Sequence, residues 1–212
     1  MKRILLMGMF ASILSFFGCK EKQSEKSKSD SEFDAQISES IEAFKNRPIH
    51  ENLTQEIIDS TKDEDLVQVI FDNLISKLPE DYTKEYETVN GWNQARKTIY
   101  LIWLLEAEVN NGGFNQFYFN SSGQFYKYIP EALLKINAEL FADLTERANK
   151  VYESENEKIT EKQDGTLEGF SESYENNPLN SFDDEFYELY DKEDLMKLQV
   201  EYIRENSKEF ID

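Results

Sequence analysis

The stretch that most constrains the fold is the apolar run IYLIWLL at residues 99–105. As a helix it presents apolar side chains in every direction, so it must be buried on every side. A buried strand could have the same composition, but the apolar pattern continues from Ala95 to Leu105, a length that favours a helix. We therefore predict an all-α fold, a compact multi-helix domain around a buried central helix at about residues 92–109.

A sharp helix end is predicted directly after this run. Asn110-Asn111-Gly112-Gly113 offers residues that take a left-handed backbone at little steric cost, which is how many helices end. We expect the aromatic residues that follow to cap the core. They are Phe114, Phe117, Tyr118, Phe119, Phe125, Tyr126 and Tyr128.

Helices with a 3.6-residue apolar period are expected on both sides of the central helix. On the N-terminal side they cover residues 33–44, a short segment around 53–58, and 63–78. Thr61-x-x-Glu64 fits a capping box for the last of these helices. On the C-terminal side Pro130 suits a first helical position. One apolar stripe then runs through Leu133, Ile136, Leu140, Leu144, Ala148 and Val151.

The remaining segments are polar and predict connections and short capped helices. Residues 82–91 predict a polar connection, and residues 153–180 predict a long acidic loop. Ser181-x-x-Asp184 and Asp191-x-x-Asp194 are each expected to cap a short terminal helix. We find no strand pattern and no internal repeat in the sequence.

The N-terminus has the form of a bacterial lipoprotein signal. Residues 1–18 combine the basic start Lys2-Arg3 with an apolar segment that is short for a membrane span. The end Phe16-Phe17-Gly18-Cys19 resembles a lipobox, which predicts that Cys19 is diacylated; the alternative is a free cysteine after an ordinary signal peptide. We expect a cell-envelope location, periplasmic or surface-exposed, with membrane contact through this lipid anchor only.

Four segments result from these patterns. Residues 1–18 are the predicted lipoprotein signal peptide, and residues 19–31 are the lipidated cysteine with a polar, flexible tether. Residues 32–60 hold N-terminal helices, and residues 61–212 form the acidic helical domain.

The net charge of −20 is concentrated near the C-terminus, where residues 153–212 contain 19 acidic and 6 basic residues. Such a field repels nucleic acid and anionic lipid and attracts basic partners or cations. We expect a basic protein surface as the partner and no direct nucleic-acid binding; the alternative is a solvated surface that only maintains solubility. The candidate acidic surface consists of Asp183, Asp184, Glu185, Glu188, Asp191 and Asp194.

A second candidate site is the loop after the central helix, which combines a carboxylate, amides and aromatic residues. Pockets for small ligands have apolar walls and a few placed polar groups, so this loop could bind a small ligand or a cation. The alternative is that the amides satisfy a buried turn and the aromatic residues belong to the core. The candidate residues are Glu108, Asn110, Asn111, Gly112, Gly113, Phe114, Asn115, Gln116, Tyr118 and Asn120.

Catalysis is the least favoured hypothesis, and no catalytic residue is predicted. Glu106 and Glu108 are two positions apart and point about 200° apart on a helix, so they do not form a facing acid–base pair. We expect one to bind local donors and the other to be solvated. The chain has no nucleophile motif or phosphate-binding glycine loop, and with one cysteine and one histidine we expect no metal site or cofactor.

Three motifs resemble the C-terminal domain of the DNA-mimic protein family. The first is EVNNGGFNQFYFN at residues 108–120, and the second is EALLKINA at residues 131–138, with Asn137 where a glycine is usual. The third is the terminal-helix stretch that runs from FDDEFY (182–187) through YIREN (202–206). The resemblance covers roughly Leu66 to Asp212. It implies an all-helical acidic domain that can form a homodimer, with surface carboxylates that stand in for DNA phosphates.

The export signal changes what this resemblance implies about the partner. A lipoprotein leaves the cytosol, where DNA-binding repressors are found, so we do not expect a repressor as the target. We predict an envelope-anchored acidic protein-binding module that acts as a decoy or inhibitor of a basic protein. The alternatives are the small-ligand or cation-binding module of residues 110–120 and, last, a carboxylate-dependent enzyme.

Overall fold

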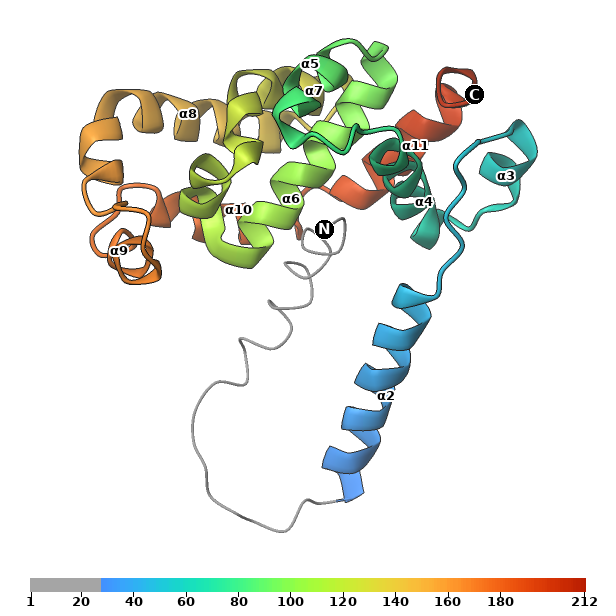
Figure 1. Cartoon of the computed structure of the whole chain (residues 1–212), viewed down its shortest axis with the longest axis horizontal. Helices are drawn as coiled ribbons and strands as arrows, with labels where there is room; N and C mark the ends of the chain where they lie inside the picture. Colours follow the sequence, from blue (N-terminus) through green and yellow to red (C-terminus); the bar gives the residue numbers. More distant parts are fainter. Residues whose placement is uncertain (1–27) are drawn as a thin grey trace.

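The computed structural model describes residues 28–212, and within this range the chain forms helices and no strand (Figure 1). The prediction of an all-α fold is confirmed. None of these helices is both long and apolar enough to cross a bilayer. The predicted signal peptide and Cys19 lie outside the described residues. The elements are α2 (Lys28–Lys45), α3 (Gln55–Ser60), α4 (Asp63–Ser76), η1 (Tyr82–Lys84), α5 (Glu85–Asn90), α6 (Gln94–Phe119), η2 (Ser121–Tyr128), α7 (Ile129–Lys135), α8 (Glu139–Thr160), α9 (Leu167–Glu172), α10 (Asn180–Leu189), α11 (Leu195–Glu205) and η3 (Ser207–Glu209).

Helix α6 is the central element and packs against α4, η2, α7, α8 and α10 (Figure 1). The side chains of Ile99, Ile102 and Leu105 are fully buried, and Tyr100 and Leu101 are 1% exposed. Burial of a side chain of this size stabilises a fold by roughly 1.5–3 kcal/mol. The prediction of a core helix buried on every side is therefore confirmed.

The double glycine bends α6 sharply, and the helix then continues to Phe119. Gly112 (φ −161°, ψ 28°) and Gly113 (φ 70°, ψ −176°) leave the helical conformation. The predicted helix end is therefore a break between two helical parts of one element. The second part begins at once because the Asp183 carboxylate accepts a hydrogen bond of 2.7 Å from the Phe114 N–H, and so satisfies a donor that a new helix leaves unpaired.

A second interruption divides the predicted stripe of residues 133–151 between α7 and α8. Asn137 adopts φ 61°. The N–H of Ala138 donates to the Leu133 carbonyl at 2.9 Å, and the N–H of Asn137 donates to the Leu134 carbonyl at 3.1 Å, which is a Schellman motif. The stripe is therefore not continuous, and Leu140 is 45% exposed.

Two of the predicted capping arrangements are wrong. The Thr61 hydroxyl donates to the Ile57 carbonyl at 2.7 Å and closes the end of α3, so α4 begins without a side-chain cap. Helix α10 also lacks a side-chain cap, because it starts at Asn180 and includes Ser181. In the third case the cap of α11 is Asp194, whose carboxylate accepts from the Lys197 N–H at 3.0 Å.

Two predicted loops contain helices. The connection at residues 82–91 includes η1 and α5, which buries Val89. The predicted loop at 153–180 contains the last turns of α8 and the whole of α9. Ile159, 2% exposed, anchors the end of α8 to the core. Single buried residues in a polar segment are too sparse for a periodic pattern, which explains the error.

Candidate functional site

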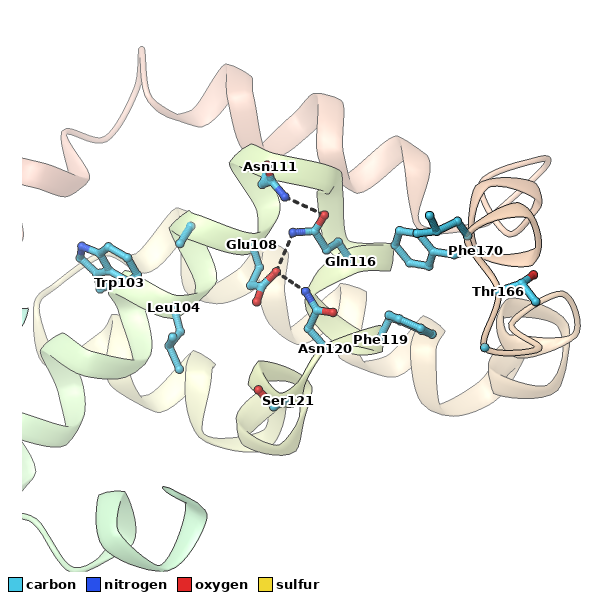
Figure 2. Close-up of a pocket in the computed structure, with 13 residues that line it drawn as sticks. Trp103, Leu104, Glu108, Asn111, Gln116, Phe119, Asn120, Ser121, Thr166 and Phe170 are labelled. Atoms are coloured by element: carbon cyan, nitrogen blue, oxygen red, sulfur yellow. Dashed lines mark hydrogen bonds between the residues drawn. The ribbon is translucent and has the colours of Figure 1, made fainter. Parts of the chain in front are cut away.

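A cavity of about 520 Å³ opens beside the bend in α6 (Figure 2). Three segments form its walls: the part of α6 before the bend, the part after it with the start of η2, and the segment that leads into α9. Two carboxamides and one carboxylate, those of Gln116, Asn120 and Glu108, point toward one another in its middle. The cavity is lined by Trp103, Leu104, Ala107, Glu108, Asn111, Gln116, Phe119, Asn120, Ser121, Gly165, Thr166, Leu167 and Phe170.

The bend in α6 brings together groups that a straight helix would separate. Glu108 Oε2 accepts hydrogen bonds from Gln116 Nε2 at 2.7 Å and from Asn120 Nδ2 at 2.8 Å. Glu108 Oε1 accepts from the Ser122 hydroxyl at 2.7 Å. In a straight helix, residues eight and twelve positions apart would be about 12 and 18 Å apart along the axis. The polar cluster therefore exists only because the helix bends.

Both glycines also leave space for the side chains at the bend. A Cβ at residue 112 would lie 2.3 Å from Gln116 Oε1, and a Cβ at Gly113 would lie 2.2 Å from Asp183 Oδ2. The backbone conformation of Gly113 is itself one that essentially only glycine adopts. Gly112 and Gly113 therefore have a structural role in the candidate site and contribute no functional group.

The hydrogen bonds of the cluster fix the orientation of each amide. An ionised carboxylate only accepts hydrogen bonds, so Gln116 and Asn120 must turn their NH₂ groups toward Glu108. The oxygen of Gln116 then accepts from Asn111 Nδ2 at 2.9 Å. As a result, the oxygens of Asn111 and Asn120 are left without a partner among the described residues.

The other predicted loop residues lie away from this cavity. Asn115 is fully buried: its Nδ2 donates to the Ser173 hydroxyl at 2.8 Å, and its Oδ1 accepts from Asn177 Nδ2 at 3.1 Å. Phe114 and Tyr118 belong to the core, and Asn110 donates to the Tyr190 hydroxyl at 3.0 Å. The loop thus divides, with Glu108, Asn111, Gln116 and Asn120 at the cavity and the rest in structural contacts.

Glu106 lies on a different side of α6 from Glu108, as the helix geometry predicts. Its carboxylate accepts from the Tyr190 hydroxyl at 3.0 Å and from Gln199 Nε2 at 2.8 Å. Burial raises the pKa of Glu106, while these two hydrogen bonds oppose the shift. The expectation that one of the two glutamates is solvated is wrong, because both are partly buried and hydrogen-bonded.

The structure places the six residues of the candidate acidic surface in two settings. Asp184, Glu188, Asp191 and Asp194 are exposed. Asp183 instead lies against the bend of α6, and burial raises its pKa to about 6, although the hydrogen bond from the Phe114 N–H opposes the shift. Glu185 forms an ion pair with Arg147 across α10 and α8. These two carboxylates therefore serve the fold.

Several residues of the cavity could not be recognised from the sequence. Ser121 lines the cavity and Ser122 donates to Glu108; both lie in the predicted aromatic segment and carry no motif. Phe170 and Leu167 come from a segment that we expected to be a loop, and they lie about sixty residues after Glu108 in the chain. No three His, Cys, Asp or Glu side chains within residues 28–212 come together as a group that could hold a metal ion.

The fold and the charge define the class of protein: an acidic, all-helical domain built around a bent central helix. The family model described as DMP19-like protein matches residues 90–206, from the end of α5 to the end of α11, and the chain belongs to this family. No curated protein and no solved structure gives a significant match. The family has DNA-mimic character, is consistent with a protein-binding module, and is not a known enzyme family.

Proposed function

We propose that this protein is an envelope-anchored acidic module that occupies a basic surface of another protein, as a decoy or inhibitor. The observation that carries the proposal is the excess of 19 acidic over 6 basic residues in segment 153–212. Lys158, Lys162, Lys192 and Lys197 pair with carboxylates of the same segment, so they are not available to balance the rest. The remaining negative charge attracts a basic partner.

Membership in the DMP19-like family supports a basic protein as the class of partner. Fixed carboxylates can replace the DNA phosphates that a basic surface otherwise binds, with the same dependence on salt. The partner we propose is an envelope or secreted protein, because the predicted lipoprotein signal would carry the chain out of the cytosol.

The test is retention of a basic protein from envelope and secreted fractions at low and high salt. A triple variant, Asp184→Asn, Glu188→Gln and Asp191→Asn, should reduce retention at low salt and flatten its salt dependence. The matched control is Glu51→Gln, Glu56→Gln and Asp65→Asn, which changes the net charge equally at exposed positions near the N-terminal end. If the two variants bind equally, or if low salt retains no basic protein, the proposal fails.

The location is a separate part of the proposal. Lipidation at Cys19 would place the domain at a membrane surface at the end of the tether, since several acyl chains bind a bilayer firmly. Cys19→Ala should abolish acyl labelling and release the protein from the membrane fraction. Retention of the variant in membranes would contradict the anchor.

A homodimer, which the family resemblance implies, is tested by sedimentation equilibrium of the same variant.

The cavity beside α6 supports a second candidate function, the binding of a small ligand. Its volume of about 520 Å³ and its mixture of aromatic walls and a few fixed polar groups are typical of ligand pockets. The side chain of Phe119 lines the cavity and is 43% exposed, so a ligand could pack against it. Fragments that raise the melting temperature of the protein should lose this effect in Phe119→Ala, while the unliganded variant keeps its fold.

A further inference from the structure

We infer that the cavity beside α6 binds an organic cation, a ligand with an aliphatic ammonium or guanidinium group. The cationic nitrogen would sit against Glu108, and the carbon chain would lie on the aromatic wall of Phe119 and Phe170. This inference rests on the small-ligand function proposed above and names its chemical class. Its observations concern the cavity and are separate from the charge of segment 153–212, on which the proposed basic protein partner rests.

The first argument is the charge of the lining. Glu108 is the only carboxylate among the residues that line the cavity, and no Lys, Arg or His side chain lines it. Glu108 takes part in none of the ion pairs formed within residues 28–212; its donors are two amides and a hydroxyl, all neutral. A cationic ligand would add an ion pair to this carboxylate, and hydrogen bonds between two charged groups are stronger than those from neutral donors.

The second argument is the direction of the amides. Because Glu108 holds the NH₂ groups of Gln116 and Asn120, and Gln116 holds that of Asn111, the groups left over are acceptors. They are the oxygens of Asn111 and Asn120. A ligand that binds to either oxygen must supply an N–H or O–H donor. An ammonium group has three N–H donors and a guanidinium group five, and neither has an acceptor.

The third argument is the aromatic wall. The rings of Phe119 and Phe170 are in contact, with 4.6 Å between their centroids. The cations that lie over aromatic rings elsewhere in the described chain use Phe44, Tyr126, Tyr128 and Phe182, so the rings of the cavity are not occupied by a cation of the protein itself. Aromatic faces attract organic cations, and they also pack against an aliphatic chain.

The same geometry disfavours the other ligand classes. An anion would meet the Glu108 carboxylate at close range. Calcium takes six to eight oxygen ligands, usually with several carboxylates, and the lining offers one carboxylate. A neutral apolar molecule would leave the acceptor oxygens of Asn111 and Asn120 without donors, which is unfavourable when they are buried under a ligand.

The test uses the full chain, purified in detergent, and two probes with the same four-carbon chain in calorimetric and NMR titrations. Agmatine, with one ammonium and one guanidinium group, should bind and shift the side-chain amide signals of Gln116 and Asn120. The neutral control, 1,4-butanediol, should bind at least tenfold more weakly. Equal binding of the two probes would overturn the inference.

Variants separate the charge of Glu108 from the integrity of the pocket. Glu108→Gln should weaken agmatine binding at least tenfold. Glu106→Gln is the matched control, because it makes the same change two positions earlier on α6, outside the cavity, and should leave the affinity unchanged. Since Glu108→Gln could also disturb the bend, Phe119→Ala provides a second variant that leaves the polar cluster intact; it should weaken agmatine binding severalfold.

The outcomes distinguish failure of this inference from failure of the pocket itself. A neutral fragment whose binding is lost in Phe119→Ala but kept in Glu108→Gln would preserve the pocket and overturn the cationic ligand. Absence of binding by every probe would overturn both. A capped Gly-Arg-Gly tripeptide that binds at least tenfold more tightly than agmatine would identify a protein side chain as the source of the cation; the reverse order would identify a free amine.

Discussion

Asp183 shows how one partly buried carboxylate stabilises the bend of α6 at a cost that depends on pH. It accepts the Phe114 N–H at the start of the second helical part, but burial raises its pKa to about 6. Between about pH 4 and pH 6 the native protein therefore holds a proton that the unfolded chain has released. The free energy of unfolding should fall as the pH rises through this window.

Asp183→Asn tests this linkage, because an asparagine oxygen can still accept the Phe114 N–H. In the wild type, the unfolding free energy should fall between pH 4 and pH 6. In Asp183→Asn this fall should be smaller by roughly 1–2 kcal/mol, a figure that allows for solvent screening. Urea unfolding at several pH values measures it. Asp184→Asn, at the exposed neighbouring position, is the control, and an unchanged slope in Asp183→Asn would contradict the assignment.

Gly113→Ala should be among the most destabilising substitutions in the chain. The new Cβ would lie 2.2 Å from Asp183 Oδ2, in a backbone conformation that costs about 1–3 kcal/mol for a residue other than glycine. With loss of the cap on Phe114, the total should be roughly 2–4 kcal/mol.

Gly165→Ala is the matched control for that prediction. Gly165 has φ +87°, but nothing lies within 4 Å of an added Cβ, so this variant carries the backbone strain without the overlap. It should cost about 1–2 kcal/mol. Denaturant midpoints of both variants give the comparison; equal losses would show that the contact with Asp183 is unimportant.

The junction between α7 and α8 depends on one left-handed residue. Asn137, with φ 61°, closes the Schellman motif that ends α7. Glycine adopts this conformation without strain. Asn137→Gly should therefore keep or raise the unfolding free energy, whereas Asn137→Ala should lower it by about 1 kcal/mol.

Thermal unfolding of these two variants checks the prediction. The control is Lys135→Ala, at an exposed helical position two residues earlier. It measures how an alanine on the surface changes the stability where the backbone is helical and φ is not positive. A stability order with alanine above glycine at position 137 would show that the junction does not require the left-handed backbone.

The side chain of Asp212 connects segments that lie far apart in the sequence. Its carboxylate accepts hydrogen bonds from Arg96 at 2.8 Å, Lys77 at 2.9 Å, the Leu53 N–H at 3.0 Å and Asn73 Nδ2 at 3.2 Å. These groups come from α6, from α4 and the residue that follows it, and from the segment before α3. The contact therefore joins the N-terminal helices to the C-terminal end of the domain.

Asp212→Asn should lower the unfolding free energy by about 1–3 kcal/mol at pH 7, since it weakens hydrogen bonds to a charged group. Burial acts to raise the pKa of Asp212, but the hydrogen bonds from Lys77, Leu53 and Asn73 outweigh it and lower the pKa to about 2. The stabilisation is thus present above about pH 4 and lost as the pH falls toward 2.

Urea titrations at pH 7 and pH 2.5 should accordingly show two curves, wild type and Asp212→Asn, that differ at neutral pH and converge in acid. The control is Asp191→Asn, at an exposed position on the same third of the chain. If the two proteins still differ by the same unfolding free energy at pH 2.5, the loss of stability comes from packing and not from the charge of Asp212.

The sequence was sufficient to predict the helical class, the buried central helix and the unusual backbone at Gly112-Gly113. Each depends on neighbours within a few positions: apolar residues on all sides of one helix, or a glycine that tolerates a positive φ. The helices at 85–90 and 167–172 were missed because they do not depend on neighbours in the sequence alone. They are six residues long, and contacts with distant segments stabilise them.

The candidate cavity could be predicted in composition but not in arrangement. The motif at residues 108–120 contains its carboxylate and its amides, yet the same motif supplies Asn115 and Phe114 to the core. Which amide faces Glu108 is decided by the angle of the bend. That angle depends on Asp183, and the far wall depends on Phe170, both more than fifty residues further along the chain.

Local sequence patterns therefore account for the helical class, the central helix and the net charge of this protein, because these depend on composition and on neighbours within a few positions. Tertiary structure decides the roles of individual carboxylates. Glu106, Glu108, Asp183 and Glu185 are equivalent as acidic residues, but packing places one against Tyr190, one in a cavity, one on a helix start and one on Arg147. The distances between segments, which no local pattern encodes, make this distinction.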